Sequence, residues 1–159
     1  MKLALCAVVL AACGTPPPVW DQVDGGACQL YQVPATLDLT TPVRSFSADV
    51  LPILNARCGT ACHGASSPAG NLTLAGSATA VYGALVGQPS GELGSMSFVA
   101  TGDPARSFLM HKLDGDQCVY DMQCAGGTCQ QAMPMSGGAL SDAQRDTIRQ
   151  WIYQGAAAD

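Results

Sequence analysis

Two cysteines and a histidine lie close together in residues 55–64, Asn-Ala-Arg-Cys-Gly-Thr-Ala-Cys-His-Gly. Three residues separate Cys58 from Cys62, and His63 directly follows the second cysteine. Each thiol can form a thioether bond to a vinyl group of haem, and the adjacent imidazole can then bind the iron as its proximal ligand. The usual spacing is C-x-x-C-H, so the extra residue is a departure. These residues predict one covalently attached haem c.

Two other interpretations of the same three side chains stay open. Cys58, Cys62 and His63 could bind copper or zinc in an exported protein, although the chain lacks the βαβ pattern typical of exported copper-binding thiol proteins. Alternatively, the two cysteines could form a local disulfide in a haem-free, disulfide-stabilised interaction module. No serine motif marks a nucleophile. We therefore predict an electron carrier rather than an enzyme, and a subunit role in an oxidoreductase complex is compatible with that prediction.

A second iron ligand has to come from a distant part of the chain. Met133 is the main candidate, in the stretch Met-Pro-Met-Ser-Gly-Gly that precedes the last helix. Met135 and His111 are its rivals. A histidine–methionine pair of ligands raises the reduction potential of a haem, which suits an electron carrier.

Helical periodicity indicates the elements that position these residues. A helix over 47–59, capped by Ser47 or Asp49, carries apolar residues and Cys58 on one side. Further helices are predicted over 77–86, over 104–113 after the start signal Asp103-Pro104, and after the capping box of Ser141 and Gln144. Short extended pieces are predicted at 30–33, 36–40 and 70–74.

The composition indicates a compact exported domain. Charged residues make up 12% of the chain and the net charge is −5, which argues against nucleic-acid binding. Eight cysteines in 159 residues favour an oxidising compartment. Cys28, Cys118, Cys124 and Cys129 are the disulfide candidates, and four cysteines allow three pairings. Three of them lie in residues 114–131, which we interpret as a disulfide-stapled insertion.

The N-terminus has the pattern of a bacterial lipoprotein signal. Residues 3–12 are almost wholly apolar, and Leu-Ala-Ala-Cys at 10–13 resembles the site where the signal is cut before a cysteine that becomes lipidated. This predicts a signal peptide over 1–12, a lipid anchor at Cys13, and a tether and extended segment over 13–43. The expected location is the outer membrane, held through the lipid.

The order of motifs from Phe46 to Ala156 resembles the cytochrome c domains of planctomycete and myxobacterial exported proteins. The matching pieces are Val50-Leu51-Pro52-Ile53-Leu54, Cys58 to Gly64, Gly70 to Leu74, Gly102-Asp103-Pro104, Met133-Pro134, and Ile148 to Ile152. The resemblance implies haem bonded at Cys58 and Cys62, His63 as proximal ligand and Met133 as distal ligand. It also implies a mostly α, class I-like cytochrome c domain over 44–159, which transfers single electrons to a redox partner that the sequence does not identify.

Overall fold

The computed structural model describes residues 28–59, 62–64, 66 and 68–159. The predicted signal peptide, the lipidation site Cys13 and most of the tether therefore lie outside the described residues. Within the described part of the chain, all regular elements are helical, and the only β pairing consists of two isolated bridges, Val86 with Val99 and Pro89 with Ser97. The prediction of a mostly α fold is confirmed. The pieces predicted to be extended form no strand in these ranges.

The first helix runs from Phe46 to Gly59 in three parts. A π-helical turn η2 (Phe46–Val50) leads into α1 (Leu51–Leu54), and a second π-helical turn η3 (Asn55–Gly59) follows. The prediction of Ser47 or Asp49 as the cap is wrong, because the Ser45 side chain accepts the hydrogen bond from the N–H of Ala48, at 3.0 Å. Asp49 completes this start by accepting from the Ser45 N–H at 2.8 Å.

The second and third predicted helices are present, the third in two pieces. Helix α2 (Ala78–Leu85) begins after the Ser77 cap. The range predicted as one helix divides into η5 (Pro104–Arg106) and α3 (Phe108–Asp114). Ser107 causes the break, because its hydroxyl donates to Asp103 O at 2.8 Å and accepts from the N–H of Ala100 at 2.9 Å, so the backbone there stays extended.

The insertion is stapled by disulfides, as predicted. It contains the short helices η6 (Gln117–Gln123) and η7 (Ala125–Gly127). Cys124 pairs with Cys129 inside the insertion, while Cys118 pairs with Cys28 in the N-terminal segment. The Cys28–Cys118 disulfide links residues 90 positions apart in the chain, so it attaches the N-terminal segment to the insertion.

Helix α4 (Asp142–Tyr153) forms the centre of the core. Its capping box is present: the Ser141 hydroxyl accepts from Gln144 N–H, and the Gln144 side chain accepts from Ser141 N–H. Trp151 is 1% exposed, and its ring lies 5.0 Å from that of Phe46 between ring centroids. This contact joins α4 to the start of the first helix. Trp151 is therefore a core residue.

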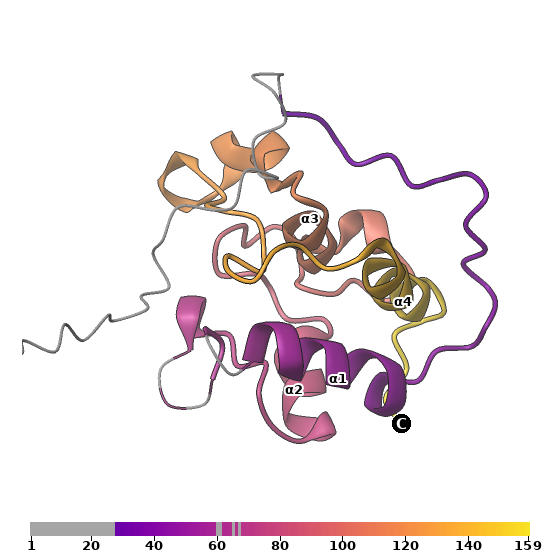
Figure 1. Cartoon of the computed structure of the whole chain (residues 1–159). Helices are drawn as coiled ribbons and strands as arrows, with labels where there is room; N and C mark the ends of the chain where they lie inside the picture. Colours follow the sequence, from indigo (N-terminus) through magenta and orange to yellow (C-terminus); the bar gives the residue numbers. More distant parts are fainter. Residues whose placement is uncertain (1–27, 60–61, 65, 67) are drawn as a thin grey trace, which may run out of the picture.

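Figure 1 shows α1 and α2 on one side of the molecule and α3 and α4 on the other, with the N-terminal segment passing outside them. Tyr31 anchors this segment: its ring packs over the guanidinium groups of Arg145 and Arg149, and its N–H donates to Asp116. Arg149 in turn donates to both carboxylate oxygens of Asp114 at 2.7 Å, which joins α3 to α4.

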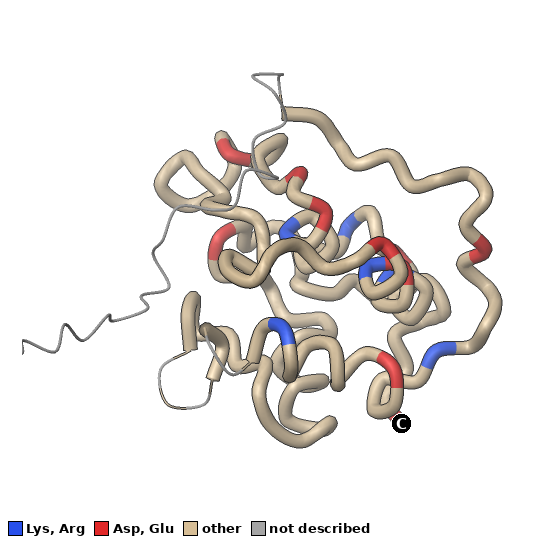
Figure 2. The backbone as a smooth tube through the Cα atoms, viewed as in Figure 1, with Lys and Arg blue, Asp and Glu red and all other residues tan. Residues whose placement is uncertain are grey.

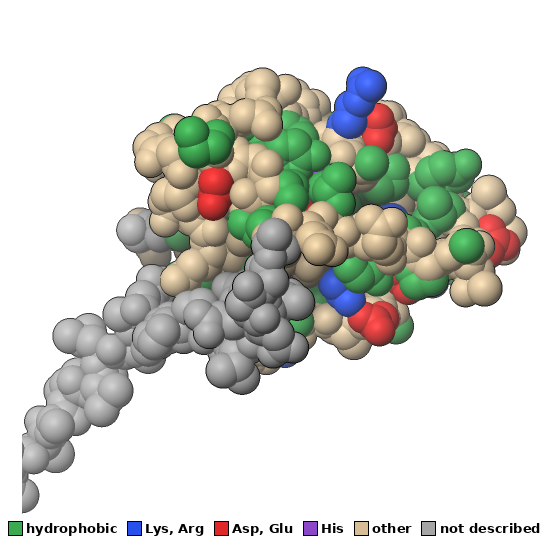
Figure 3. Space-filling model, turned by 90° about the horizontal axis from the view of Figure 1, so that it is seen from above, with side chains coloured by type: hydrophobic (Ala, Val, Ile, Leu, Met, Phe, Trp, Pro, Cys, Tyr) green, Lys and Arg blue, Asp and Glu red, His purple; other side chains and the backbone are tan. Residues whose placement is uncertain are grey.

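The charged residues are few and spread along the backbone (Figure 2). On the face seen in Figure 3, hydrophobic side chains are scattered among polar ones, with only a few charges between them. In the ranges that the structure describes, no helix has both the length and the apolar character needed to cross a bilayer.

Candidate functional site

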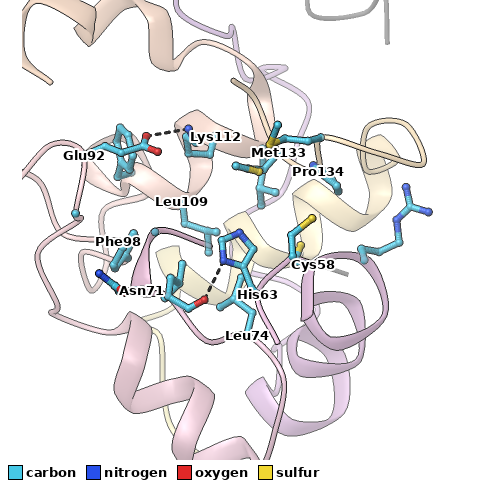
Figure 4. Close-up of a pocket in the computed structure, with 18 of the residues that line it drawn as sticks. Cys58, His63, Asn71, Leu74, Glu92, Phe98, Leu109, Lys112, Met133 and Pro134 are labelled. Carbon is cyan, nitrogen blue, oxygen red and sulfur yellow. Dashed lines mark hydrogen bonds and ion pairs between the residues drawn. The ribbon is translucent and has the colours of Figure 1, made fainter. Parts of the chain in front are cut away.

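The main pocket lies where the end of the first helix, α3 and the methionine-containing loop meet (Figure 4). Its volume is about 270 Å³. One wall comes from the Cys58–His63 region and the turn that follows it, and the opposite wall comes from α3. Residues from all of these elements line it: Cys58, Cys62, His63, Leu72, Leu74, Phe98, Phe108, Leu109, Leu113, Met133 and Met135.

Cys58 is a free thiol on the pocket wall. It is 7% exposed, and it sits on η3 at the end of the helix that the sequence predicts to deliver it. Burial raises the pKa of the Cys58 thiol to about 11, although the positive charge of Arg57 opposes the rise, so the thiol is protonated near neutral pH. The alternative of a local disulfide between Cys58 and Cys62 is wrong for this structure, because Cys58 has no disulfide partner.

Cys62 lines the same pocket, and its sulfur is part of a disulfide in the structure. A thioether is formed by a thiol, so a bond from Cys62 to haem requires this disulfide to be reduced first. The two predicted attachment residues are therefore not equivalent. Cys58 offers its thiol directly to a group in the pocket.

His63 is buried, with 8% of its surface exposed, and one of its ring nitrogens is already occupied. Its Nδ1 atom lies 2.9 Å from the carbonyl oxygen of Leu72. A carbonyl oxygen can only accept a hydrogen bond, so Nδ1 carries the proton. In the neutral ring the Nε2 atom then keeps its lone pair, as in a histidine that binds a metal. In Figure 4 the ring extends into the pocket beside Cys58.

The turn η4 (Ala69–Asn71) brings the Leu72 carbonyl to His63. Gly70 and Asn71 both have positive φ angles, of 60° and 58°, which glycine and asparagine tolerate best. The chain then returns alongside the histidine, where Leu74 N–H donates to His63 O at 2.9 Å. The stretch 70–74 is thus the support of the histidine, a role that the sequence did not predict.

Met133 and Met135 both line the pocket, from the loop that precedes α4. Met133 also packs against the main hydrophobic core, and Figure 4 shows it at the edge of the pocket next to α3. His111 is not among the lining residues. Its Nδ1 lies 2.7 Å from the Asp116 carboxylate and its Nε2 lies 3.1 Å from Ala105 O, so both ring nitrogens are engaged elsewhere.

Two charged groups also lie at the pocket, Arg57 and Lys112. Arg57 lines the pocket, and its Nε atom is buried without a hydrogen-bond partner. Lys112 is 6% exposed, and its Nζ atom donates to Glu92 Oε2 at 2.9 Å on the α3 wall. The sequence contained a signal for Lys112, because the helical pattern puts this residue on the same side of α3 as Leu109 and Leu113.

The arrangement suits a large apolar group that brings its own metal. In the described ranges, no three side chains of His, Cys, Asp and Glu are grouped so that they could hold a metal ion by themselves. What the pocket offers instead is one imidazole with an available nitrogen, two thioether sulfurs, one thiol and an apolar lining.

Comparisons with known proteins add no further identification. No protein-family model, no curated protein sequence and no solved structure matches this chain.

Proposed function

We propose that this chain is an exported, lipid-anchored c-type cytochrome, which carries single electrons on one covalently attached haem. The observation that carries the proposal is the pocket itself. Cys58, His63 and Met133 lie up to 75 positions apart in the sequence, yet all three line one apolar cavity. A protein that used these side chains only for packing would have no reason to leave a cavity between them.

The residues at the pocket fit haem in three respects. The Nε2 lone pair of His63 is available for the iron, since the proton is held on Nδ1 by Leu72 O. The lining is mostly apolar, as the faces of the porphyrin require. The buried Nε–H of Arg57 lacks a partner, and a propionate carboxylate is an acceptor that would satisfy this charged donor. The cavity of about 270 Å³ lies just below the usual range for ligand pockets.

Each residue then has a distinct role. Cys58 would bond the group covalently through its free thiol, and Cys62 would add a second bond only after a thiol reductant has opened its disulfide. His63 binds the iron from one wall, and Met133, with Met135 as its rival, provides the second ligand from the loop. Haem held by these ligands supplies a one-electron couple, as its iron alternates between two oxidation states. Leu109 and Leu113 on α3 keep water away from the group.

The proposal includes a fold of the cytochrome c type, export and membrane anchoring through Cys13. What supports the fold is the mostly helical architecture together with the order of motifs along the chain. What supports export is the lipoprotein-like N-terminal sequence and the disulfides Cys28–Cys118 and Cys124–Cys129, which persist in oxidising compartments. The partner is a redox protein whose identity we leave open.

The test is expression of the full chain in a bacterium that exports it and attaches haem c. We expect a red protein with one haem per chain, which stays with the polypeptide after acid–acetone extraction. A metal assay on the same sample measures iron, copper and zinc. A colourless protein without metal would overturn the proposal in favour of an interaction module, and bound copper or zinc without haem would overturn it in favour of a metal-binding protein.

A further inference from the structure

The loop that carries Met133 has no regular structure of its own. It runs from Cys129, which ends the disulfide-stapled insertion, to Ser141, which caps α4. An irregular segment of this length holds a side chain in one place only if other elements bind its backbone. Two basic residues from different walls of the pocket do so, one near each end of the loop.

Lys112 binds the first part of the loop. Its Nζ atom lies 2.7 Å from the carbonyl oxygen of Cys129, and its own carbonyl oxygen accepts the N–H of Met133, at 2.7 Å. Its side chain is 8% exposed, and Glu92 balances its charge. One residue of α3 therefore holds the backbone at two positions, four residues apart, and the second of them is Met133 itself.

Arg57 binds the second part of the loop. Its Nη2 atom lies 3.0 Å from Gly137 O, 2.9 Å from Gly138 O and 3.4 Å from Ala139 O. Gly137 and Gly138 have φ angles of +75° and +78°, a conformation that glycine adopts most readily and that turns successive carbonyl groups toward the guanidinium. Because Arg57 directly precedes Cys58, this contact joins the attachment helix to the loop across the pocket.

We infer that Arg57 and Lys112 are positioning residues, which clamp the methionine loop at two points and so hold the methionine sulfur over the pocket. The inference rests on the proposed function, in which that sulfur binds the iron. Hydrogen bonds from charged donors to carbonyl groups are about twice as strong as neutral ones. Losing either contact should therefore leave the methionine in place less of the time, without removing any group that touches the iron.

The test compares Arg57→Met and Lys112→Met with the conservative variants Arg57→Lys and Lys112→Arg in the full chain. Arg106→Met is the matched control, because the Arg106 side chain is 82% exposed and its ion pair is with Asp103, outside the pocket. In haem-loaded protein, imidazole is titrated into the ferric form until it displaces the methionine. Far-ultraviolet circular dichroism checks that each variant is folded.

In Arg57→Met and Lys112→Met, imidazole should displace half of the iron-bound methionine at a concentration about tenfold lower than in the wild type. This difference equals ~1.4 kcal/mol. The conservative variants should recover most of this difference, and Arg106→Met should match the wild type. If the wild type carries haem but Arg57→Met and Lys112→Met titrate like Arg106→Met, the clamp is wrong while the proposed function stands.

A second measurement uses the haem-free chain, so it does not depend on haem attachment. Amide hydrogen exchange is followed in residues 129–139 by mass spectrometry. The clamp predicts that amide exchange in this segment is at least about tenfold faster in Arg57→Met and Lys112→Met than in the wild type. The exchange rate in α2 should not change. Equal exchange in the wild type and both variants would overturn the clamp. If the wild type binds no haem but exchange is faster in the two variants, the clamp is supported and only the proposed function is wrong.

Discussion

The Nδ1 atom of His63 lies 2.9 Å from the carbonyl oxygen of Leu72, and both residues line the same pocket. This bond sets the tautomer and the orientation of the ring. A carbonyl oxygen can only accept a hydrogen bond, so Nδ1 has to carry the proton. A histidine oriented in this way is prepared to bind a metal through Nε2 before the metal arrives. Nine positions separate the two residues, and the turn η4 brings them together.

The two loop methionines can be separated by substitution. Met133→Ala should remove the distal ligand and lower the reduction potential by at least about 59 mV, which is a tenfold change for a one-electron couple. Met135→Ala should leave the potential close to that of the wild type. Redox titration followed by absorbance measures both. The reverse order of effects would move the ligand to Met135.

The two pocket cysteines should contribute unequally to haem attachment. Cys58→Ser should lose more haem in acid–acetone than Cys62→Ser, because Cys58 offers the free thiol to the pocket, whereas Cys62 is in a disulfide. Cys62→Ser should retain haem through one thioether. One unreacted vinyl group then shifts the absorption bands of the alkaline pyridine complex to longer wavelength. Equal retention of haem in the two variants would contradict this assignment.

Two glycines should respond in opposite directions to alanine. A Cβ atom at Gly59 would lie 2.7 Å from Leu74 O, so the end of η3 and the support of His63 would have to move apart. We expect Gly59→Ala to reduce the free energy of unfolding by about 1–3 kcal/mol. At Gly83, inside α2 and exposed, a Cβ meets nothing within 4 Å.

Gly83→Ala is therefore the matched control, and it should increase the free energy of unfolding by about 0.5–1 kcal/mol, because alanine loses less backbone entropy in a helix. Urea unfolding of both variants beside the wild type measures the difference. A Gly59→Ala variant as stable as Gly83→Ala would mean that the two segments are not in close contact.

Stability should fall as the pH rises through the pKa of His111. Burial disfavours the charged ring, but the hydrogen bond and charge of Asp116, with Ala105 O and Asp114, outweigh burial and raise the His111 pKa above its ordinary value of 6.5. The folded state then binds the proton more tightly than the unfolded state. The resulting stabilisation is complete below pH 6.5 and is lost at higher pH, as the ring loses its proton in the folded state.

Urea unfolding from pH 6 upward should show this loss, with a slope of at most about 1.4 kcal/mol per pH unit from this group. His111→Gln cannot titrate, so its stability should be flatter over the same range. Tyr120, whose ring packs on His111 at 4.8 Å between centroids, is present in both the wild type and His111→Gln. Equal slopes in the two proteins would show that His111 does not carry the effect.

Local signals in the sequence were sufficient to predict α1 to α4, but not the short helices η4, η6 and η7. The capping box at Ser141 and Gln144 and the repeat of apolar residues predicted α4, because both depend on residues within one or two turns. The same kind of signal misplaced the first cap, where Ser45 acts, and missed the break at Ser107. At Ser107 the decisive bond goes to Ala100, seven residues back, and helical periodicity carries no information about such a contact.

The sequence by itself supplied the residue types on which the haem proposal rests, Cys58, Cys62, His63 and the loop methionines, and the structure brings them to one pocket. Only the tertiary structure decided which cysteines pair, which nitrogen of His63 is available and where Lys112 finds Glu92. Each of these depends on the distance between atoms whose residues are five to ninety positions apart. Such distances follow from how the helices pack, and no spacing in a single sequence specifies them.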